Sequence, residues 1–212
     1  MHTLFIAIQY IGILILLVEA FYVIGQRPSK QQQYLTFLIF SLCVNFVGYL
    51  LELQAGTKQE ALMAVKFQYL GKPYVVLFQL LFTMQICKVK IHRNLVRALA
   101  CMHTAIVFLV LTSGSHSLFY SSIEFTEEGV FPHLVLERSL IYNLYSLVLV
   151  VYAVAMAAVC LARYREAKSP VERNQYWYLM LINLVAVLGF AIYLSGVTQG
   201  YEITLVAYLI DV

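Results

Sequence analysis

Residues 3–24 read TLFIAIQYIGILILLVEAFYVI, and this stretch decides the fold class because it contains a single charged side chain, Glu19. About 20 mostly apolar residues are needed for a helix to cross the roughly 30 Å hydrocarbon core of a bilayer. The stretch is longer than the apolar core of a signal peptide, about 7–15 residues, and no small-residue cleavage site follows it. We therefore interpret residues 3–24 as a membrane helix that the mature protein retains.

Similar apolar stretches recur along the chain. We predict further complete spans over residues 34–53, 61–87, 95–112, 139–161 and 176–195, and the start of a seventh helix over residues 203–212. The predicted fold class is all-α, a polytopic transmembrane bundle of six full helices plus the start of a seventh. By this prediction residues 1–212 form one domain that is truncated within the seventh helix, because so short a segment cannot cross a bilayer.

The composition agrees with a membrane environment. Hydrophobic residues make up 62% of the 212 and charged residues 12%, and the mean hydropathy is +0.80. A soluble domain carries about 25% charged residues, so these side chains cannot cover a water-facing surface. Nucleic acid is excluded as a partner because the basic residues lie in short connections and not on one face of a soluble domain. The expected partner is the lipid bilayer.

Basic residues are unevenly divided between the predicted connections. Ten of the 14 Lys and Arg residues lie in three alternate connections: Arg27, Lys30, Lys88, Lys90, Arg93, Arg97, Arg163, Arg165, Lys168 and Arg173. The connections on the other side carry only Lys58, Lys66 and Arg138. Because cytoplasmic loops are enriched in Lys and Arg, we predict that the N-terminus lies outside and that the C-terminal end leads into the cytoplasm.

Several functional classes find no support in the sequence. The chain has no catalytic motif, so we do not expect this segment to be an enzyme. A retinal protein needs a Schiff-base lysine in its last helix, and residues 174–212 contain no lysine. His103 is the one histidine inside a predicted span, so paired haem ligands are missing and no cofactor is expected. The four cysteines show no CxxC spacing, which argues against a metal site.

Polar residues within the predicted spans have a structural interpretation. Neutral polar groups inside membrane helices usually form hydrogen bonds between helices, each contributing about 1 kcal/mol. We expect this role for the following residues, with Glu19 lying toward the inner end of the first span: Asn45, Gln79, Gln85, His103 and Asn183.

Short motifs add a resemblance to a known family. They are Lys66–Pro73 (KFQYLGKP), Thr112–Tyr120 (TSGSHSLFY), Glu172–Gln175 (ERNQ) and Gly200–Thr204 (GYEIT). In this order and placement they resemble the N-terminal seven-transmembrane sensor region of bacterial histidine kinases, which also occurs ahead of diguanylate cyclase (GGDEF) domains. The chain departs from the family pattern at two positions: Leu205 stands where a Pro is frequent, and Glu202 stands where Asp is usual.

The resemblance implies a function and a location. It implies a sensory input domain in a bacterial inner membrane, which detects an extracellular or membrane signal and passes it to a cytoplasmic output module of the same polypeptide. That module would be a histidine kinase or a diguanylate cyclase. The ligand would be a small extracellular or lipid molecule, and a homodimer is implied by the same resemblance.

Four residues are candidates for ligand binding. Ionisable residues at membrane depth point to function because burying a charge is unfavourable. Lys72 precedes Pro73, which can kink the helix of the third span because proline lacks a backbone N–H. We place Lys72 near the outer end of that span. Glu52, His116 and Glu202 fall on the same side, so the four could line an extracellular pocket. The structural alternatives are a lysine that reaches toward the interface and acidic residues at solvated helix ends.

Two other functions remain open. A small transporter or channel would need polar residues near the midplane on several helices, and the spans contain few. A membrane enzyme would need a convergent His/Asp/Glu motif facing one leaflet, and no such motif is visible. A reading frame that continues into an output domain would favour the sensor.

Overall fold

The computed structural model describes residues 2–27, 29–127, 131–195 and 201–211. Its helices are α1 (His2–Ile24), α2 (Lys30–Leu53), α3 (Lys58–Tyr69), α4 (Lys72–Ile86), α5 (Arg93–Leu111), α6 (Leu140–Glu166), α7 (Pro170–Leu194) and α8 (Ile203–Asp211). Two strands, β1 (Tyr120–Thr126) and β2 (His133–Arg138), lie between α5 and α6. Within these described residues, five helices are long and apolar enough to cross a bilayer: α1, α2, α5, α6 and α7.

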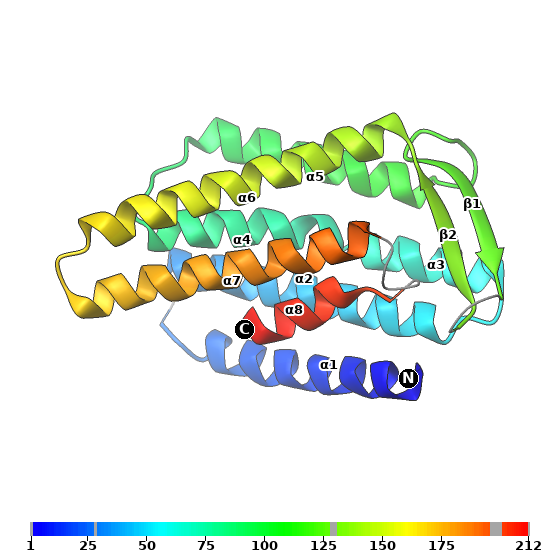
Figure 1. The fold of residues 1–212 in the computed structure, drawn as a ribbon, viewed down its shortest axis with the longest axis horizontal. Coiled ribbons are helices and arrows are strands. Elements are labelled where there is room, and N and C mark those ends of the chain that lie inside the picture. The colour runs from blue at the N-terminus through cyan, green and yellow to red at the C-terminus, as the bar shows by residue number, and fades with distance from the viewer. Residues whose placement is uncertain (1, 28, 128–130, 196–200, 212) are drawn as a thin grey trace.

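The helices form one elongated bundle, and α2 lies in its interior (Figure 1). Helix α2 packs against α1, α3 and α4, whereas α7 packs against α6 on one side and α8 on the other. Buried side chains of α2, such as Ile39 and Phe46, join the same apolar cluster as Leu16 of α1 and Leu205 of α8. The last helix is therefore anchored in the core of the bundle.

Local signals explain several helix starts. The side chains of Ser29 and Thr57 accept hydrogen bonds from backbone N–H groups in the first turns of α2 and α3, and Ser139 does the same for α6. Such caps satisfy donors that a helix leaves unpaired at its N-terminus. Helix α7 starts at Pro170, six residues before the predicted span, because proline is well suited to the first turn.

The predicted third span is wrong in its continuity. Residues 61–87 were expected to form one helix, but α3 ends at Tyr69 and α4 begins at Lys72. Proline lacks a backbone N–H and fixes its own φ, so it is accommodated at a helix start and not inside one. Pro73 lies in the first turn of α4, which places the interruption directly before it.

The segment between the fourth and fifth predicted spans is a correction to the all-α fold class. Residues 113–138, the longest connection between predicted spans and one rich in glutamate, were expected to form a loop. Instead, Tyr120–Thr126 and His133–Arg138 pair as an antiparallel hairpin, with Ile123 opposite Leu136 and Phe125 opposite Leu134. After a register shift between Tyr120 and Ile123, apolar and polar residues alternate from Ile123 to Thr126, which is the period of a half-buried strand. Residues of the hairpin and of α3, including Tyr120, Leu134 and Val65, share one buried apolar cluster.

The two ends of the bundle differ in chemistry. The β-hairpin and the start of α1 lie at one end, which we call the hairpin end, and the α1–α2, α4–α5 and α6–α7 connections lie at the other, the basic end (Figure 1). Contacts at the basic end join these connections: Lys88 pairs with Glu172 at 3.6 Å, and the Arg163 Nε–H donates to the Cys87 carbonyl at 2.8 Å. The three connections that carry ten of the 14 basic residues therefore share one end.

Candidate functional site

The break between α3 and α4 is pressed against the middle of α2. A Cβ atom on Gly71 would lie 2.3 Å from the carbonyl oxygen of Ser41, so no larger residue fits without movement. A Cβ atom on Gly48 would likewise lie 2.6 Å from the Gln68 side chain. Because Ser41 lies halfway along α2, the following residue, Lys72, begins deep in the bundle. Lys72 is therefore the first residue of α4, at a break midway along α2, and not near the outer end of one continuous third span as predicted.

Lys72 forms an ion pair with Glu202, the residue that precedes α8. The Lys72 Nζ lies 2.5 Å from Glu202 Oε1, and the two side chains are 26% and 6% exposed. The ammonium group also lies 5.7 Å from the centre of the Tyr69 ring, where a ring face attracts a cation. The Glu202 backbone N–H donates to the Tyr49 hydroxyl at 2.8 Å. These contacts connect the start of α8 to both α4 and α2.

Glu52 joins the same group through an amide. The Gln68 Nε2–H donates a hydrogen bond to the Glu52 carboxylate. A small cavity of about 30 Å³ is bordered by Glu52, Lys72 and Glu202 together with Tyr49, Val65, Gln68, Tyr69, Tyr120 and Leu136. A cavity of roughly 10–15 Å³ or more can hold a water molecule when polar partners surround it. The cavity is therefore large enough for water. We call its Glu52, Lys72 and Glu202 side chains the charged cluster.

The β-hairpin closes the charged cluster from the hairpin end. The Tyr120 hydroxyl donates to the Tyr69 hydroxyl at 2.8 Å, and both side chains are buried. The ring of Tyr69 also makes an edge contact with Phe119. The hairpin is thus part of the site, although its acid-rich sequence had indicated only a loop.

His116 does not join the charged cluster. Its Nε2 lies 2.8 Å from the Thr112 hydroxyl, and its Nδ1 accepts from the Leu118 backbone N–H at 3.3 Å. Both contacts are local and stabilise the turn after α5. Of the four candidate residues, the structure therefore brings together three and leaves His116 in its own loop.

Sequence reasoning missed three polar neighbours of the cluster: Tyr49, Gln68 and Tyr69. Gln68 and Tyr69 lie within the motif at residues 66–73, and Tyr49 lies three residues before Glu52, which is one helical turn. A search for polar residues three or four positions from each charged candidate would have found all three, because Gln68 and Tyr69 precede Lys72 by four and three residues. Nothing in the sequence places these residues next to Glu202, which is far away in the chain.

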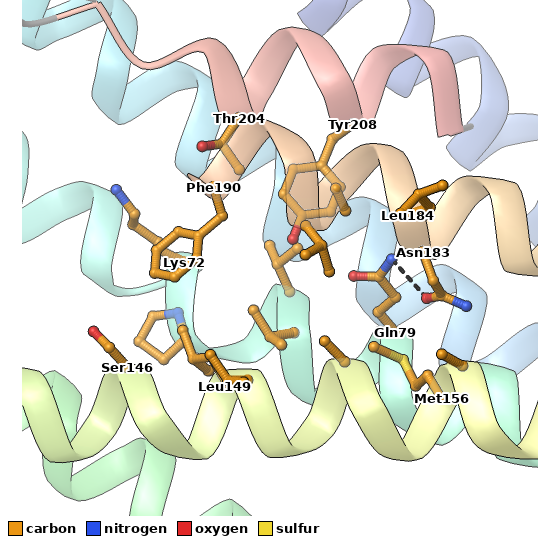
Figure 2. Close-up of a pocket in the computed structure, with 18 of the residues that line it drawn as sticks. Lys72, Gln79, Ser146, Leu149, Met156, Asn183, Leu184, Phe190, Thr204 and Tyr208 are labelled. Atoms are coloured by element: carbon orange, nitrogen blue, oxygen red, sulfur yellow. Dashed lines mark hydrogen bonds between the residues drawn. The ribbon is translucent and has the colours of Figure 1, made fainter. Parts of the chain in front are cut away.

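A larger cavity lies beside the charged cluster. It has a volume of about 520 Å³ and lies between α4, α6, α7 and α8. Lys72, Thr204 and Ser146 lie at one end, and Gln79, Asn183 and Met156 lie at the other (Figure 2). Most of its wall is apolar side chains, and Lys72 and Glu202 border this cavity as well as the small one. We call it the lateral cavity.

Three of the five polar residues inside the spans, Gln79, His103 and Asn183, form hydrogen bonds between helices as predicted. The Gln79 amide N–H donates to Asn183 Oδ1 at 3.1 Å, which joins α4 to α7 (Figure 2). His103 of α5 lies 3.1 Å from the Tyr145 hydroxyl and 3.2 Å from the Tyr152 hydroxyl, both on α6. Asn45 differs, because its Oδ1 is buried and has no hydrogen-bond partner. Among the residues that the structure describes, no three His, Cys, Asp or Glu side chains gather as metal ligands.

The arrangement of long apolar helices defines a class: a multi-pass helical membrane protein with a charged cluster inside the bundle. The family model described as the N-terminal 7TM region of histidine kinase matches residues 8–211. The chain therefore belongs to this family of membrane sensor regions, as the sequence motifs had indicated. No curated protein matches the chain significantly.

Proposed function

We propose that this chain is a membrane-embedded input domain that detects an extracellular or membrane signal and passes it to a cytoplasmic output module of the same polypeptide. The output module would be a histidine kinase or a diguanylate cyclase. Membership of the family and the apolar helices support the sensory role. The distribution of basic residues supports an orientation with the N-terminus and the hairpin end outside.

The ion pair between Lys72 and Glu202 is the observation that carries this proposal. Glu202 directly precedes α8, the last helix, which would lead toward an output module. A ligand changes a two-state equilibrium only when it binds the two states with different affinity. A signal that loosens or tightens the charged cluster would favour one position of α8 over another. Glu52 and Lys72 would then contact the signal, whereas His116, which borders neither cavity, would not.

The first test is to determine the coding sequence beyond Val212. We expect a kinase or cyclase module to follow the last helix, and a stop codon there would contradict the proposed function. The second test measures the activity of that module in the full-length protein in proteoliposomes. We expect Lys72→Met and Glu202→Gln to shift basal output in the same direction by about fivefold or more, the lower range of allosteric coupling.

Two further variants sharpen this test. The charge exchange Lys72→Glu with Glu202→Lys should return output toward the wild-type level if the pair itself sets the position of α8. Lys58→Ala is the control, since Lys58 is exposed at the start of α3 and its loss should leave output unchanged. Unchanged output in both single variants of the pair would show that the cluster does not control signalling.

The lateral cavity favours a second candidate function, a small transporter or channel. It carries a Gln79–Asn183 hydrogen bond at one end and the charged pair at the other. Flux of ions or small solutes in proteoliposomes, above that of protein-free liposomes and abolished by Asn183→Leu, would support this function. Absence of flux would leave the sensor as the better account.

A further inference from the structure

The lateral cavity is elongated along the direction in which the helices cross the membrane. Its α6 wall extends from Tyr142 to Ala157, and its α7 wall from Trp177 to Phe190. At about 1.5 Å of rise per residue these walls are roughly 20 Å long. One leaflet contributes about half of a roughly 30 Å hydrocarbon core. The cavity is thus long and narrow enough to take one extended acyl chain, and its 520 Å³ lies within the size range of ligand pockets.

The cavity opens sideways, between α6 and α7. Side chains on its rim are strongly exposed, with values of 63% for Val154 on α6 and 50% for Leu184 on α7. Both helices have the length and composition of membrane spans, so the surroundings of this opening are hydrocarbon. An apolar molecule can therefore reach the cavity from the bilayer without crossing water.

The end of the cavity near Lys72 has hydrogen-bonding groups that need partners. Thr204 is 8% exposed and Asn45 is 2% exposed, and neither the Thr204 hydroxyl nor Asn45 Oδ1 has a hydrogen-bond partner. Both residues line the cavity. Thr204 follows Glu202 by two residues, and Asn45 precedes Tyr49 by one helical turn. Each therefore lies within about one helical turn of the contact between Glu202 and Tyr49. Buried polar groups of this kind are normally paired.

The charges at this end select against a charged head group. Lys72 and Glu202 already neutralise each other at 2.5 Å. An anionic head would have to compete with Glu202, whereas a cationic head would approach Lys72. Asn45 Oδ1 can only accept a hydrogen bond, so its partner must donate. A hydroxyl group both donates and accepts, and it satisfies Asn45 and Thr204 without separating the ion pair.

We propose that the lateral cavity binds a single-chain amphiphile with an uncharged, hydroxyl-bearing head, taken up sideways from the bilayer. The chain lies between α6 and α7 with its methyl end toward Trp177, and the head lies beside Asn45 and Thr204. This proposal rests on the proposed sensory function only for its consequence: a head group beside Glu202 contacts the start of α8. The binding itself is independent of any output module.

Trp177 makes the binding measurable because it is the only tryptophan of the chain and lines the cavity. The probe is a long-chain monoacylglycerol brominated near its methyl end, added to the full chain in phosphatidylcholine nanodiscs, since bromine quenches nearby tryptophan. We expect saturable quenching, with an apparent affinity about tenfold tighter than that of the fatty acid of the same chain, the difference that about one lost hydrogen bond to a buried group produces.

Matched variants separate the chain site from the head site. Ala153→Phe fills the cavity and should abolish saturable quenching, whereas Val151→Phe, on an exposed position of α6 that does not line the cavity, should not. Thr204→Val and Asn45→Leu should each weaken monoacylglycerol binding by about tenfold and leave fatty-acid binding unchanged. Thr36→Val is the control for the loss of a threonine hydroxyl, because Thr36 bonds only to the Gln32 carbonyl of its own helix.

Three outcomes would overturn the proposal. Quenching that rises linearly with probe concentration, or that survives Ala153→Phe, would show that only bulk lipid reaches Trp177. Equal or tighter binding of the fatty acid would show that the head group is anionic. Unchanged affinity in both Thr204→Val and Asn45→Leu would show that the head group does not bind beside these two residues. Saturable binding with no change in the output of the full-length protein would uphold the binding proposal and contradict only its consequence for α8, whereas the pair variants at Lys72 and Glu202 test the sensory function separately.

Discussion

At the scale of single residues, Lys72 and Glu202 form an ion pair in which both charges are poorly hydrated, so the stability of the bundle depends on keeping both partners. The carboxylate side chain is 6% exposed and the lysine 26%. Removing one partner of a buried ion pair leaves an uncompensated charge, which typically lowers stability by about 3–5 kcal/mol. Replacing both partners with neutral groups removes that penalty. The pair is therefore expected to show strong coupling between its two members.

A double-mutant cycle tests this coupling. We expect Lys72→Met alone to lower the free energy of unfolding by about 3 kcal/mol, and the double variant with Glu202→Gln to lose less than the sum of the two single variants. The measurement is thermal unfolding in detergent, followed by the loss of the folded peak in size-exclusion chromatography. Additive losses would mean that the two residues do not act as a pair in solution.

Gly71 is the second residue on which the site depends. A Cβ atom would lie 2.3 Å from the Ser41 carbonyl oxygen, which is a backbone atom and cannot turn away. Overpacking of this kind costs about 1–3 kcal/mol. We expect Gly71→Ala to lower the melting temperature and to separate the α3–α4 break from α2. Gly56→Ala is the control, since the nearest atom to its Cβ would lie 3.8 Å away; an equal loss in both variants would contradict the packing argument.

At the scale of elements, α5 is linked to α6 by hydrogen bonds from one side chain. His103 is fully buried and lies within 3.1 and 3.2 Å of the hydroxyls of Tyr145 and Tyr152. Removing the imidazole leaves two buried hydroxyl groups without this partner, and each unpaired buried group costs about 1–3 kcal/mol. The α5–α6 association is therefore expected to depend on this histidine more than on the surrounding apolar contacts.

The corresponding variant is His103→Leu, which keeps the volume and removes both hydrogen bonds. We expect a loss of about 2–4 kcal/mol in the free energy of unfolding, measured by thermal unfolding in detergent. Cys101→Ala on the same helix is exposed and should change stability little. A stability of His103→Leu that equals the wild type would show that the tyrosines find other partners.

At the scale of the whole molecule, the proposed orientation predicts that one end of the bundle is accessible from outside the cell and that the other end is not. The proposed orientation places the hairpin end outside the cell and the basic end in the cytoplasm. Ser121 is exposed in β1, and Lys168 is exposed between α6 and α7. Strand β1 and the α6–α7 connection lie at opposite ends of the bundle (Figure 1). Each can carry a cysteine without disturbing the core.

Labelling of intact cells with a membrane-impermeant thiol reagent tests the orientation. In a background where the four native cysteines are replaced by alanine or serine, we expect Ser121→Cys to react in intact cells and Lys168→Cys to react only after permeabilisation. The reverse pattern would place the N-terminus in the cytoplasm and would contradict the proposed direction of signalling. Equal expression of the two variants is the control.

The sequence by itself determined the membrane environment, the family and the approximate positions of the apolar helices, although not the break between α3 and α4. Hydrocarbon requires long apolar segments, so the spans are visible residue by residue. The start of α8 at Ile203 was predicted because the apolar run after residue 200 is local information. Glu52, Lys72 and Glu202 were chosen because a charge within an apolar segment stands out. The motif at residues 66–73 likewise needed no tertiary information.

Only the tertiary structure decided how these residues meet. It paired Lys72 with Glu202 across more than half of the chain and left His116 with Thr112 in its own turn. It turned an acid-rich loop into a hairpin that covers Tyr69, and it formed a cavity between α4, α6, α7 and α8 that Asn45 of α2 also lines. The physical reason is that side-chain contacts and cavities depend on the rotation and spacing of packed helices. Hydropathy, which averages over a whole segment, carries no information about either.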